Sequence, residues 1–194
     1  MSGKKFSLKV ILVGNSGVGK TSLVSAFFEN PFETQSLPTI APASCSAIIP
    51  LDNNVSVELQ IWDTAGQERF QSISHMFYRD SHIAFVCFDK ESVDSVEIWI
   101  GRVRAEVPEC AIFLVTTKSD LLVDTERTEL EEKGAEMIKR FGAKLHAFTS
   151  SSKGTGIKEL FRSAAQFVNQ IYVSNQPTTE IDLTTKQETK KCNC

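Results

Sequence analysis

Residues 14–21 read GNSGVGKT, which matches the motif G-x-x-x-x-G-K-T. The motif follows the apolar run VILV at 10–13 and precedes a helix-like stretch at 21–28. A strand, a glycine-rich loop and a helix in this order are typical of a phosphate-binding loop, whose backbone N–H groups point at phosphate oxygens. In such a loop Lys20 contacts the β- and γ-phosphates, and the Thr21 hydroxyl ligates Mg²⁺. The motif therefore predicts a nucleoside triphosphate site, with a glycine-rich turn that holds no ligand as the alternative.

The composition fits one globular domain with a tail. The chain has 194 residues, of which 41% are hydrophobic and 23% are charged, and its formal net charge is −3. A chain without a basic excess is not expected to bind nucleic acid. No apolar run approaches the roughly 18 residues of a membrane span, and the N-terminus lacks a signal-peptide pattern. We therefore expect a cytosolic protein with reduced cysteines.

Apolar segments predict strands at 8–13, 44–49, 55–62, 83–88, 111–116 and 145–149. Two of them, 83–88 and 111–116, are almost continuously apolar, which indicates strands buried on both faces of a parallel sheet. Residues 55–61 alternate instead, as in a half-exposed edge strand, and the turn signal DNN at 52–54 predicts a hairpin with the preceding strand. Helix-period segments between the strands indicate a doubly wound α/β sheet, with its ligand at the carboxyl ends of the strands. After residue 173 the composition becomes polar, so 1–173 is predicted to be the domain and 174–194 a flexible tail.

A second motif, DTAGQE at 63–68, directly follows a predicted strand. An aspartate at the end of a strand that faces a phosphate loop can hold Mg²⁺, usually through water, and Asp63 is the candidate. Gly66 has no side chain, so its N–H can approach the γ-phosphate, and Gln67 is suited to orient an attacking water. An aspartate-initiated turn is the alternative. Thr39 is expected to join Mg²⁺ only while the γ-phosphate is present, which would make its loop a nucleotide-dependent switch.

Two further segments concern the base. TKSD at 117–120 ends a predicted strand, and the Asp120 carboxylate can accept two hydrogen bonds from the N1–H and 2-amino groups of guanine. Adenine lacks this pair of donors, so the pairing would select GTP over ATP. TSSSK at 149–153 follows the last strand, and a backbone N–H there is expected to reach the guanine carbonyl. A solvated turn is the alternative for both segments.

In this order, the segments 14–21, 39, 63–68, 117–120 and 150–152 resemble the motifs of the Ras superfamily of small GTPases. The run ELQIWDTAGQERF at 58–70 and the terminal Cys-Asn-Cys resemble the Rab family in particular. The resemblance covers roughly residues 6–173 and the terminus. It implies a P-loop NTPase fold of class α/β, with a six-stranded, mostly parallel sheet, one antiparallel edge strand and five helices. It also implies GTP binding and hydrolysis with Mg²⁺ as cofactor, and a switch function in vesicle traffic.

The resemblance implies roles for individual residues. Gln67 and Lys20 would act in catalysis, and Thr21, Thr39 and Asp63 would hold Mg²⁺. Phe32 would pack against the base. The nucleotide-binding set would be Ser16, Gly17, Val18, Gly19, Lys20, Thr21, Ser22, Phe32, Thr39, Gly66, Thr117, Lys118, Asp120, Ser150, Ser151 and Ser152.

The chain departs from the Rab pattern in the base-binding motifs. Thr117 stands where most Rabs have asparagine, so one contact to the purine is expected to weaken, while Asp120 keeps the main discrimination. Ser152 replaces the usual lysine, unless Lys153 takes that role.

A second group of departures lies in the switch region. Residues 41–42 are Ala-Pro, where the family has a glycine and an apolar residue, and proline cannot donate a backbone hydrogen bond. Either Ser44 or Cys45 stands where Rabs place an aromatic partner of Trp62 and Phe77. The aromatic effector surface is therefore expected to be incomplete.

The resemblance also implies partners and a location. No internal arginine finger is evident, so intrinsic hydrolysis should be slow, and an arginine from a GTPase-activating protein would accelerate it by about 10³–10⁵. Further expected partners of the monomer are an exchange factor, a GDP-dissociation inhibitor or escort protein, and effectors that contact residues 35–45 and 64–80. Cys192 and Cys194 do not fit C-a-a-X but resemble the C-x-C ending that carries two geranylgeranyl groups in Rabs. Two geranylgeranyl groups would anchor the protein stably to the cytosolic face of an endomembrane. The alternative is that both cysteines are unmodified and have no function.

Two other functions stay open at the level of sequence. The departures at 41–42 and at the missing aromatic position allow a nucleotide-binding scaffold that hardly switches. A phosphate loop also serves small-molecule kinases. The kinase is disfavoured because Gln67 suits water activation and Asp120 suits guanine recognition, and neither organises a phosphoryl acceptor.

Overall fold

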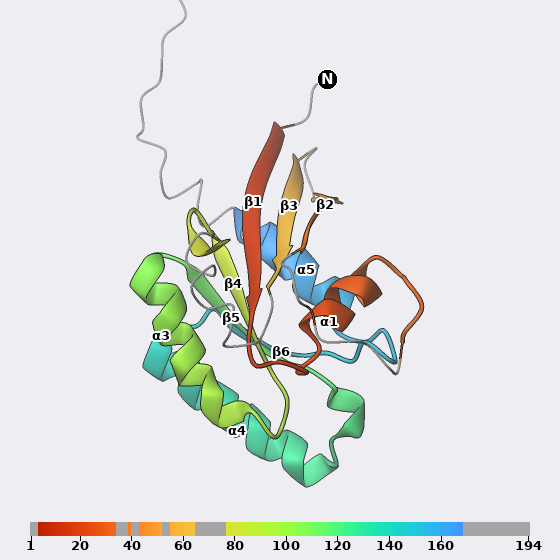
Figure 1. The fold of residues 1–194 in the computed structure, drawn as a ribbon, viewed down its shortest axis with the longest axis vertical. Coiled ribbons are helices and arrows are strands. Elements are labelled where there is room, and N and C mark those ends of the chain that lie inside the picture. Colours follow the sequence, from red (N-terminus) through yellow and green to blue (C-terminus); the bar gives the residue numbers. More distant parts are fainter. Residues whose placement is uncertain (1–3, 34–38, 40–42, 52–54, 65–76, 169–194) are drawn as a thin grey trace, which may run out of the picture.

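The computed structural model of the chain describes residues 4–33, 39, 43–51, 55–64 and 77–168 (Figure 1). These residues form one six-stranded sheet with the order β2-β3-β1-β4-β5-β6. β2 and β3 pair antiparallel, and all other neighbours pair parallel. The predicted six strands and the predicted pairing of the second with the third are thereby confirmed. The strands are β1 Lys4–Val13, β2 Ala43–Pro50, β3 Val55–Asp63, β4 Ile83–Phe88, β5 Ala111–Thr116 and β6 Leu145–Phe148.

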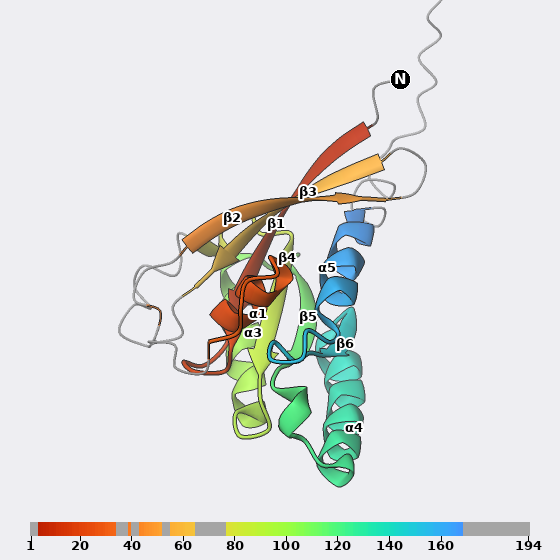
Figure 2. The ribbon, with the colours of Figure 1, turned by 90° about the vertical axis from the view of Figure 1, so that its right-hand side faces the viewer.

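Helices cover both faces of the sheet. The described α-helices are α1 Lys20–Phe27, α3 Val96–Glu106, α4 Asp124–Phe141 and α5 Ile157–Gln166, with 3₁₀ turns η2 Val93–Ser95 and η3 Ser119–Leu121. Side chains of α1 and α5 pack into one buried cluster, and those of α3 and α4 pack into another. Figure 1 shows α3 with α4 on one side and α1 with α5 on the other, and Figure 2 shows α4 and α5 in line along one side of the molecule. Phe77 and Tyr78 are also helical, and the residues before them, 65–76, lie outside the described residues, so the fifth predicted helix stays a prediction.

The central strands are buried as their sequences predicted. Every residue of β4 and of β5 is buried, because helices lie on both faces of these strands. The helices bury one apolar face each: α3 buries Val96, Trp99, Ile100 and Val103, and α5 buries Ile157, Leu160, Phe161 and Ala164. Among the described helices, none is both long enough and apolar enough to span a bilayer.

β3 is not the edge strand that its alternating pattern predicted. It lies between β2 and β1, and β2 is the antiparallel edge strand. The alternation arises because Val57, Leu59 and Ile61 are buried under α1 and α5, whereas Gln60 on the other face is exposed. Alternation therefore indicated that only one face of the strand is well covered, and it carried no information about a missing neighbour.

The parallel strands bring the sequence motifs to one end of the sheet. In parallel pairing all carboxyl ends point the same way, so the residues that follow β1, β3, β4, β5 and β6 meet there. Figure 1 shows β1 and β4 ending at the lower side of the molecule, where the phosphate loop connects β1 to α1. The predicted boundary at residue 173, the tail at 174–194 and Cys192 and Cys194 lie outside the described residues.

Candidate functional site

Glycines set the path of the loop between β1 and α1. Gly14, Gly17 and Gly19 have φ values of 142°, 78° and 98°, which L-residues with a side chain rarely adopt. A Cβ on Gly14 would lie 2.1 Å from the carbonyl oxygen of Cys87 in β4. Gly14 therefore has to be a glycine both for its conformation and for its close approach to β4.

The Lys20 ammonium group is held inside this loop. Its Nζ donates to the carbonyl oxygens of Gly14 at 2.9 Å and Asn15 at 2.8 Å, and the residue is only 5% exposed. Burial lowers its pKa below the ordinary 10.5, and the nearby Cys87 and Asp63 act in the opposite direction. Neutral carbonyl oxygens are weaker partners for an ammonium than phosphate oxygens, so an arriving phosphate group can replace them.

Three oxygen-bearing side chains converge beside Lys20. The Thr21 hydroxyl lies 2.6 Å from Asp63 Oδ2, to which it donates, and also 2.6 Å from the Thr39 hydroxyl. Asp63 is 4% exposed, and its Oδ1 is buried without a hydrogen-bond partner among the described residues. Burial raises the pKa of Asp63, and the Thr21 hydrogen bond and Lys20 oppose this rise. The structure thus brings together the three residues that the sequence analysis selected for Mg²⁺.

Serine hydroxyls orient the Asp120 carboxylate. Ser150 Oγ donates to Asp120 Oδ1 at 2.5 Å, and Ser152 Oγ donates to Asp120 Oδ2 at 2.9 Å. The hydrogen bond from Ser150 is the main reason why the pKa of Asp120 lies below its ordinary value. The segments 117–120 and 149–153 therefore meet as predicted, and the charged carboxylate is an acceptor for paired N–H donors. Ser151 is half-buried beside them.

Sequence reasoning missed Asp89, which directly follows β4. Asp89 Oδ2 accepts from Lys118 Nζ at 2.8 Å, and Asp89 Oδ1 accepts from Ser92 Oγ at 2.6 Å. Burial raises the pKa of Asp89, but the hydrogen bonds from Lys118 and Ser92 outweigh it and hold the pKa below its ordinary value. These contacts fix the Lys118 side chain within the base-binding motif. A polar residue directly after a buried strand was the available signal, and it is the same signal that selected Asp63.

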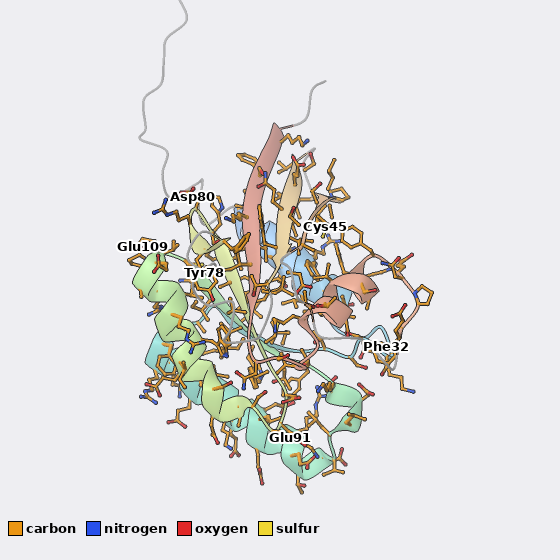
Figure 3. All side chains as sticks on the ribbon, viewed as in Figure 1. Phe32, Cys45, Tyr78, Asp80, Glu91 and Glu109 are labelled. Carbon is orange, nitrogen blue, oxygen red and sulfur yellow. The ribbon has the colours of Figure 1, made fainter. Side chains whose placement is uncertain are left out.

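Phe32 follows α1 and lines a pocket there. It is 47% exposed and lines an open pocket together with Thr21 and Ser22. Figure 3 shows it beyond α1 at the edge of the molecule. Thr117 and Lys118 line another open pocket, together with Asp89. Phe32 thus shares a pocket with Thr21, and its contact with the base stays a prediction.

Comparison with known proteins gives the family. The family model for the Ras family matches residues 9–188. The GTP-binding protein ypt5 of Schizosaccharomyces pombe is 36% identical over 162 residues, which cover 81% of this chain and 76% of ypt5. Ras-related protein Rab-24 of Dictyostelium discoideum is 32% identical, with 100% of both chains covered. The chain belongs to the Rab family of Ras-superfamily small GTPases. Rab-5B of Plasmodium falciparum is also similar, at 33% identity over 87% of this chain and 83% of the relative.

As a Rab, the protein is a GTP-hydrolysing switch of vesicle traffic, and its fold is the G domain of that family. The small-molecule kinase that the phosphate loop alone allowed is therefore wrong. Nothing in the comparisons favours the scaffold that hardly switches.

The threonine that replaces the Rab asparagine bonds to the phosphate loop. Thr117 is 3% exposed, and its hydroxyl donates to the Val18 carbonyl oxygen at 2.6 Å, with the Phe88 carbonyl oxygen at 3.1 Å. A hydroxyl has a single hydrogen, so this donor is engaged within the protein. Thr117 thus connects the base-binding motif to the phosphate loop.

The structure also determines the register of the departure from the Rab aromatic surface. Ser44 of β2 lies directly opposite Trp62 of β3, and Cys45 pairs with Ile61. The Trp62 ring still packs near Phe77, with 5.7 Å between ring centroids. Ser44 is therefore the residue at the position of the missing aromatic ring.

Several predicted site residues lie outside the described residues. Gly66 and Gln67 are among them, as are Ala41 and Pro42. Ser16, Gly17, Val18, Gly19 and Ser22 are described and form the loop and the first turn of α1, as the motif predicted.

Proposed function

We propose that GTP binds with Mg²⁺ at the carboxyl ends of the strands, within a G domain formed by residues 1–173. The observation that supports this most is the convergence of Thr21, Thr39 and Asp63, with hydroxyl and carboxylate oxygens 2.6 Å apart. Hard cations prefer oxygen ligands, and the unpartnered Oδ1 of Asp63 fits such an ion or its bound water. Within the described residues no three His, Cys, Asp or Glu side chains cluster, so hydroxyl, water and phosphate oxygens complete the site. The ion supplies positive charge that offsets the charge on the phosphates.

The remaining site residues act on the phosphates and the base. Backbone N–H groups of residues 16–22 face the phosphates, and Lys20 exchanges its two carbonyl partners for phosphate oxygens. Gln67 orients the attacking water, and the N–H of Gly66 contacts the γ-phosphate. Asp120 accepts hydrogen bonds from the N1–H and 2-amino groups of guanine, and Lys118 and Phe32 contact the base. A backbone N–H of residues 150–152 donates to the guanine carbonyl oxygen.

Nucleotide binding and hydrolysis test this proposal. Fluorescent GDP should be displaced by GTP and GDP and not by ATP, and Asp120→Ala should remove that preference. Gln67→Leu should slow single-turnover GTP hydrolysis, because it removes the group that positions the water. Gln60→Leu is the matched control, since Gln60 lies exposed on β3 and contacts Ser7. Equal displacement by ATP would contradict the base assignment, and an unaltered rate in Gln67→Leu would contradict the role of Gln67.

Regulation and membrane attachment complete the proposal. Thr39 leaves the site after hydrolysis, so residues 35–45 and 64–80 would differ between the GTP and GDP states. Partners that distinguish the two states would contact these residues: exchange factors, GTPase-activating proteins, GDP-dissociation inhibitors and effectors.

Cys192 and Cys194 carry prenyl groups that hold the protein on the cytosolic face of an endomembrane, with the polar residues 174–191 as a spacer. Replacing both cysteines by serine should move the protein to the cytosolic fraction of cells. Retention of that variant on membranes would argue against prenyl anchoring.

A further inference from the structure

A tryptophan of α3 bonds to the phosphate loop from outside the loop. The indole Nε1 of Trp99 donates to the side-chain Oδ1 of Asn15 at 2.7 Å, across 84 residues of sequence. Asn15 is the second residue of the motif at 14–21, a position at which the motif accepts any residue. The motif therefore gives no reason for this contact, and the inference drawn from it rests on the nucleotide site proposed above.

Trp99 is held firmly by its surroundings. It is 7% exposed and belongs to the buried cluster that includes Val96, Ile100 and Val103 of the same helix. The guanidinium group of Arg102 lies over its ring, 4.6 Å from the centroid. Because a buried indole has only two side-chain torsions and one donor, the position of its N–H is set by α3.

Asn15 is held from its other side as well. Its carbonyl oxygen accepts from Lys20 Nζ at 2.8 Å while its side chain accepts from Trp99. Its neighbours include Gly14 and Gly17, with φ values of 142° and 78°. Glycines make the unliganded loop costly to order, because they have the most conformations to lose. An external hydrogen bond at Asn15 reduces that cost before a nucleotide arrives.

We propose that Trp99 is a positioning residue of the phosphate loop, which it pre-orders for nucleotide phosphates through Asn15. Neither the indole nor the Asn15 amide needs to contact the nucleotide for this effect. Pre-ordering lowers the entropy lost on binding, so it strengthens GDP and GTP binding to the same extent. Uniform binding of this kind leaves the rate constant for hydrolysis of bound GTP unchanged.

Double-mutant analysis of GDP affinity tests the contact in the full chain. Trp99→Phe removes the N–H donor and keeps an aromatic ring, and Asn15→Ala removes the acceptor. Each change should weaken GDP and GTP binding about 2- to 10-fold, the range expected for one hydrogen bond. The double variant should bind GDP as tightly as whichever single variant has the lower affinity, because the second change removes no further interaction. Glu97→Gln is the control: it lies on the same helix, and its ion pair with Arg140 is remote from the loop.

A spectroscopic measurement separates positioning from general stabilisation. The chain has two tryptophans, so the indole N–H resonance that disappears in Trp99→Phe is assigned to Trp99. Asn15→Ala should shift this resonance and leave that of Trp62 in place. Multiplicative losses of affinity in the double variant, or an unshifted Trp99 resonance in Asn15→Ala, would overturn the inference. Failure of the unmodified chain to bind GDP would instead overturn the proposed site, and the resonance would still report on the contact.

Discussion

Replacing Thr117 by valine removes a buried hydrogen bond between the base-binding motif and the phosphate loop. Valine keeps the branched shape, so the change deletes the hydroxyl with little change in volume. The hydroxyl donates to the Val18 carbonyl oxygen at 2.6 Å, and Thr117 and Val18 are 3% and 2% exposed. Water cannot readily replace a donor in such a buried place, so the cost is that of an unsatisfied carbonyl. We expect the free energy of unfolding to fall by about 1–3 kcal/mol.

The assay is urea unfolding of the nucleotide-free and GDP-bound protein, followed by the GDP dissociation constant. Thr117→Ser keeps the hydroxyl and should retain most of the stability and affinity that Thr117→Val loses. Because the hydroxyl bonds to the phosphate loop, Thr117→Val should weaken GDP binding without changing the preference for guanine over adenine. Asp120→Ala, in contrast, should remove that preference. A Thr117→Val protein as stable as the unmodified chain, or one that selectively loses guanine preference, would refute this reasoning.

Three further changes test other parts of the structure. Burial lowers the pKa of His146 from 6.5 to about 4, so only the unfolded state gains a proton between these pH values. The free energy of unfolding is therefore fully retained above pH 6.5 and should fall by about 1.4 kcal/mol per pH unit below it, a slope that His146→Gln should lack in urea titrations. Gly156→Ala places a Cβ 2.1 Å from the Phe148 carbonyl oxygen and should lower the melting temperature by several degrees more than Gly154→Ala, which has similar φ and open space; equal losses would contradict the clash. Chelation of Mg²⁺ should speed GDP release from the unmodified protein, and Asp63→Asn should release GDP fast with or without chelator; a strong chelator response in the variant would contradict its role.

The sequence predicted the sheet well because its signals are local. Strands β4 and β5 begin and end as predicted, since each is a continuous apolar run bounded by polar residues. β1 begins earlier than predicted, at Lys4, because the polar residues at its start pair with β3 rather than pack in the core. The position of β3 inside the sheet depends on strand order, and no pattern within a single strand carries that information.

In the candidate site as well, local sequence signals predicted some contacts and tertiary packing determines the others. Motif spacing selected Thr21, Thr39 and Asp63, and the structure brings them together. The contacts of Asn15 with Trp99 and of Lys118 with Asp89 join residues 84 and 29 positions apart, on elements whose side chains meet only after the sheet and helices pack. The Trp99 ring is buried in the core, yet its one polar atom donates a hydrogen bond to the phosphate loop.

The departures from the Rab pattern have different structural consequences. In the base-binding motifs each substituted side chain makes a hydrogen bond: Thr117 bonds to the phosphate loop, and Ser152 bonds to Asp120. These substitutions keep the polar groups satisfied, so they are compatible with a working guanine site. Ser44, opposite Trp62, has no ring that could pack against the indole. The Lys9 ammonium group lies over the Trp62 ring instead, with its Nζ 4.8 Å from the ring centroid. A serine hydroxyl in place of an aromatic ring, next to the Lys9 cation, makes this surface more polar for a binding partner. The nucleotide site is not altered by this substitution. We therefore expect Ser44→Phe to alter which effectors bind while leaving GDP affinity unchanged.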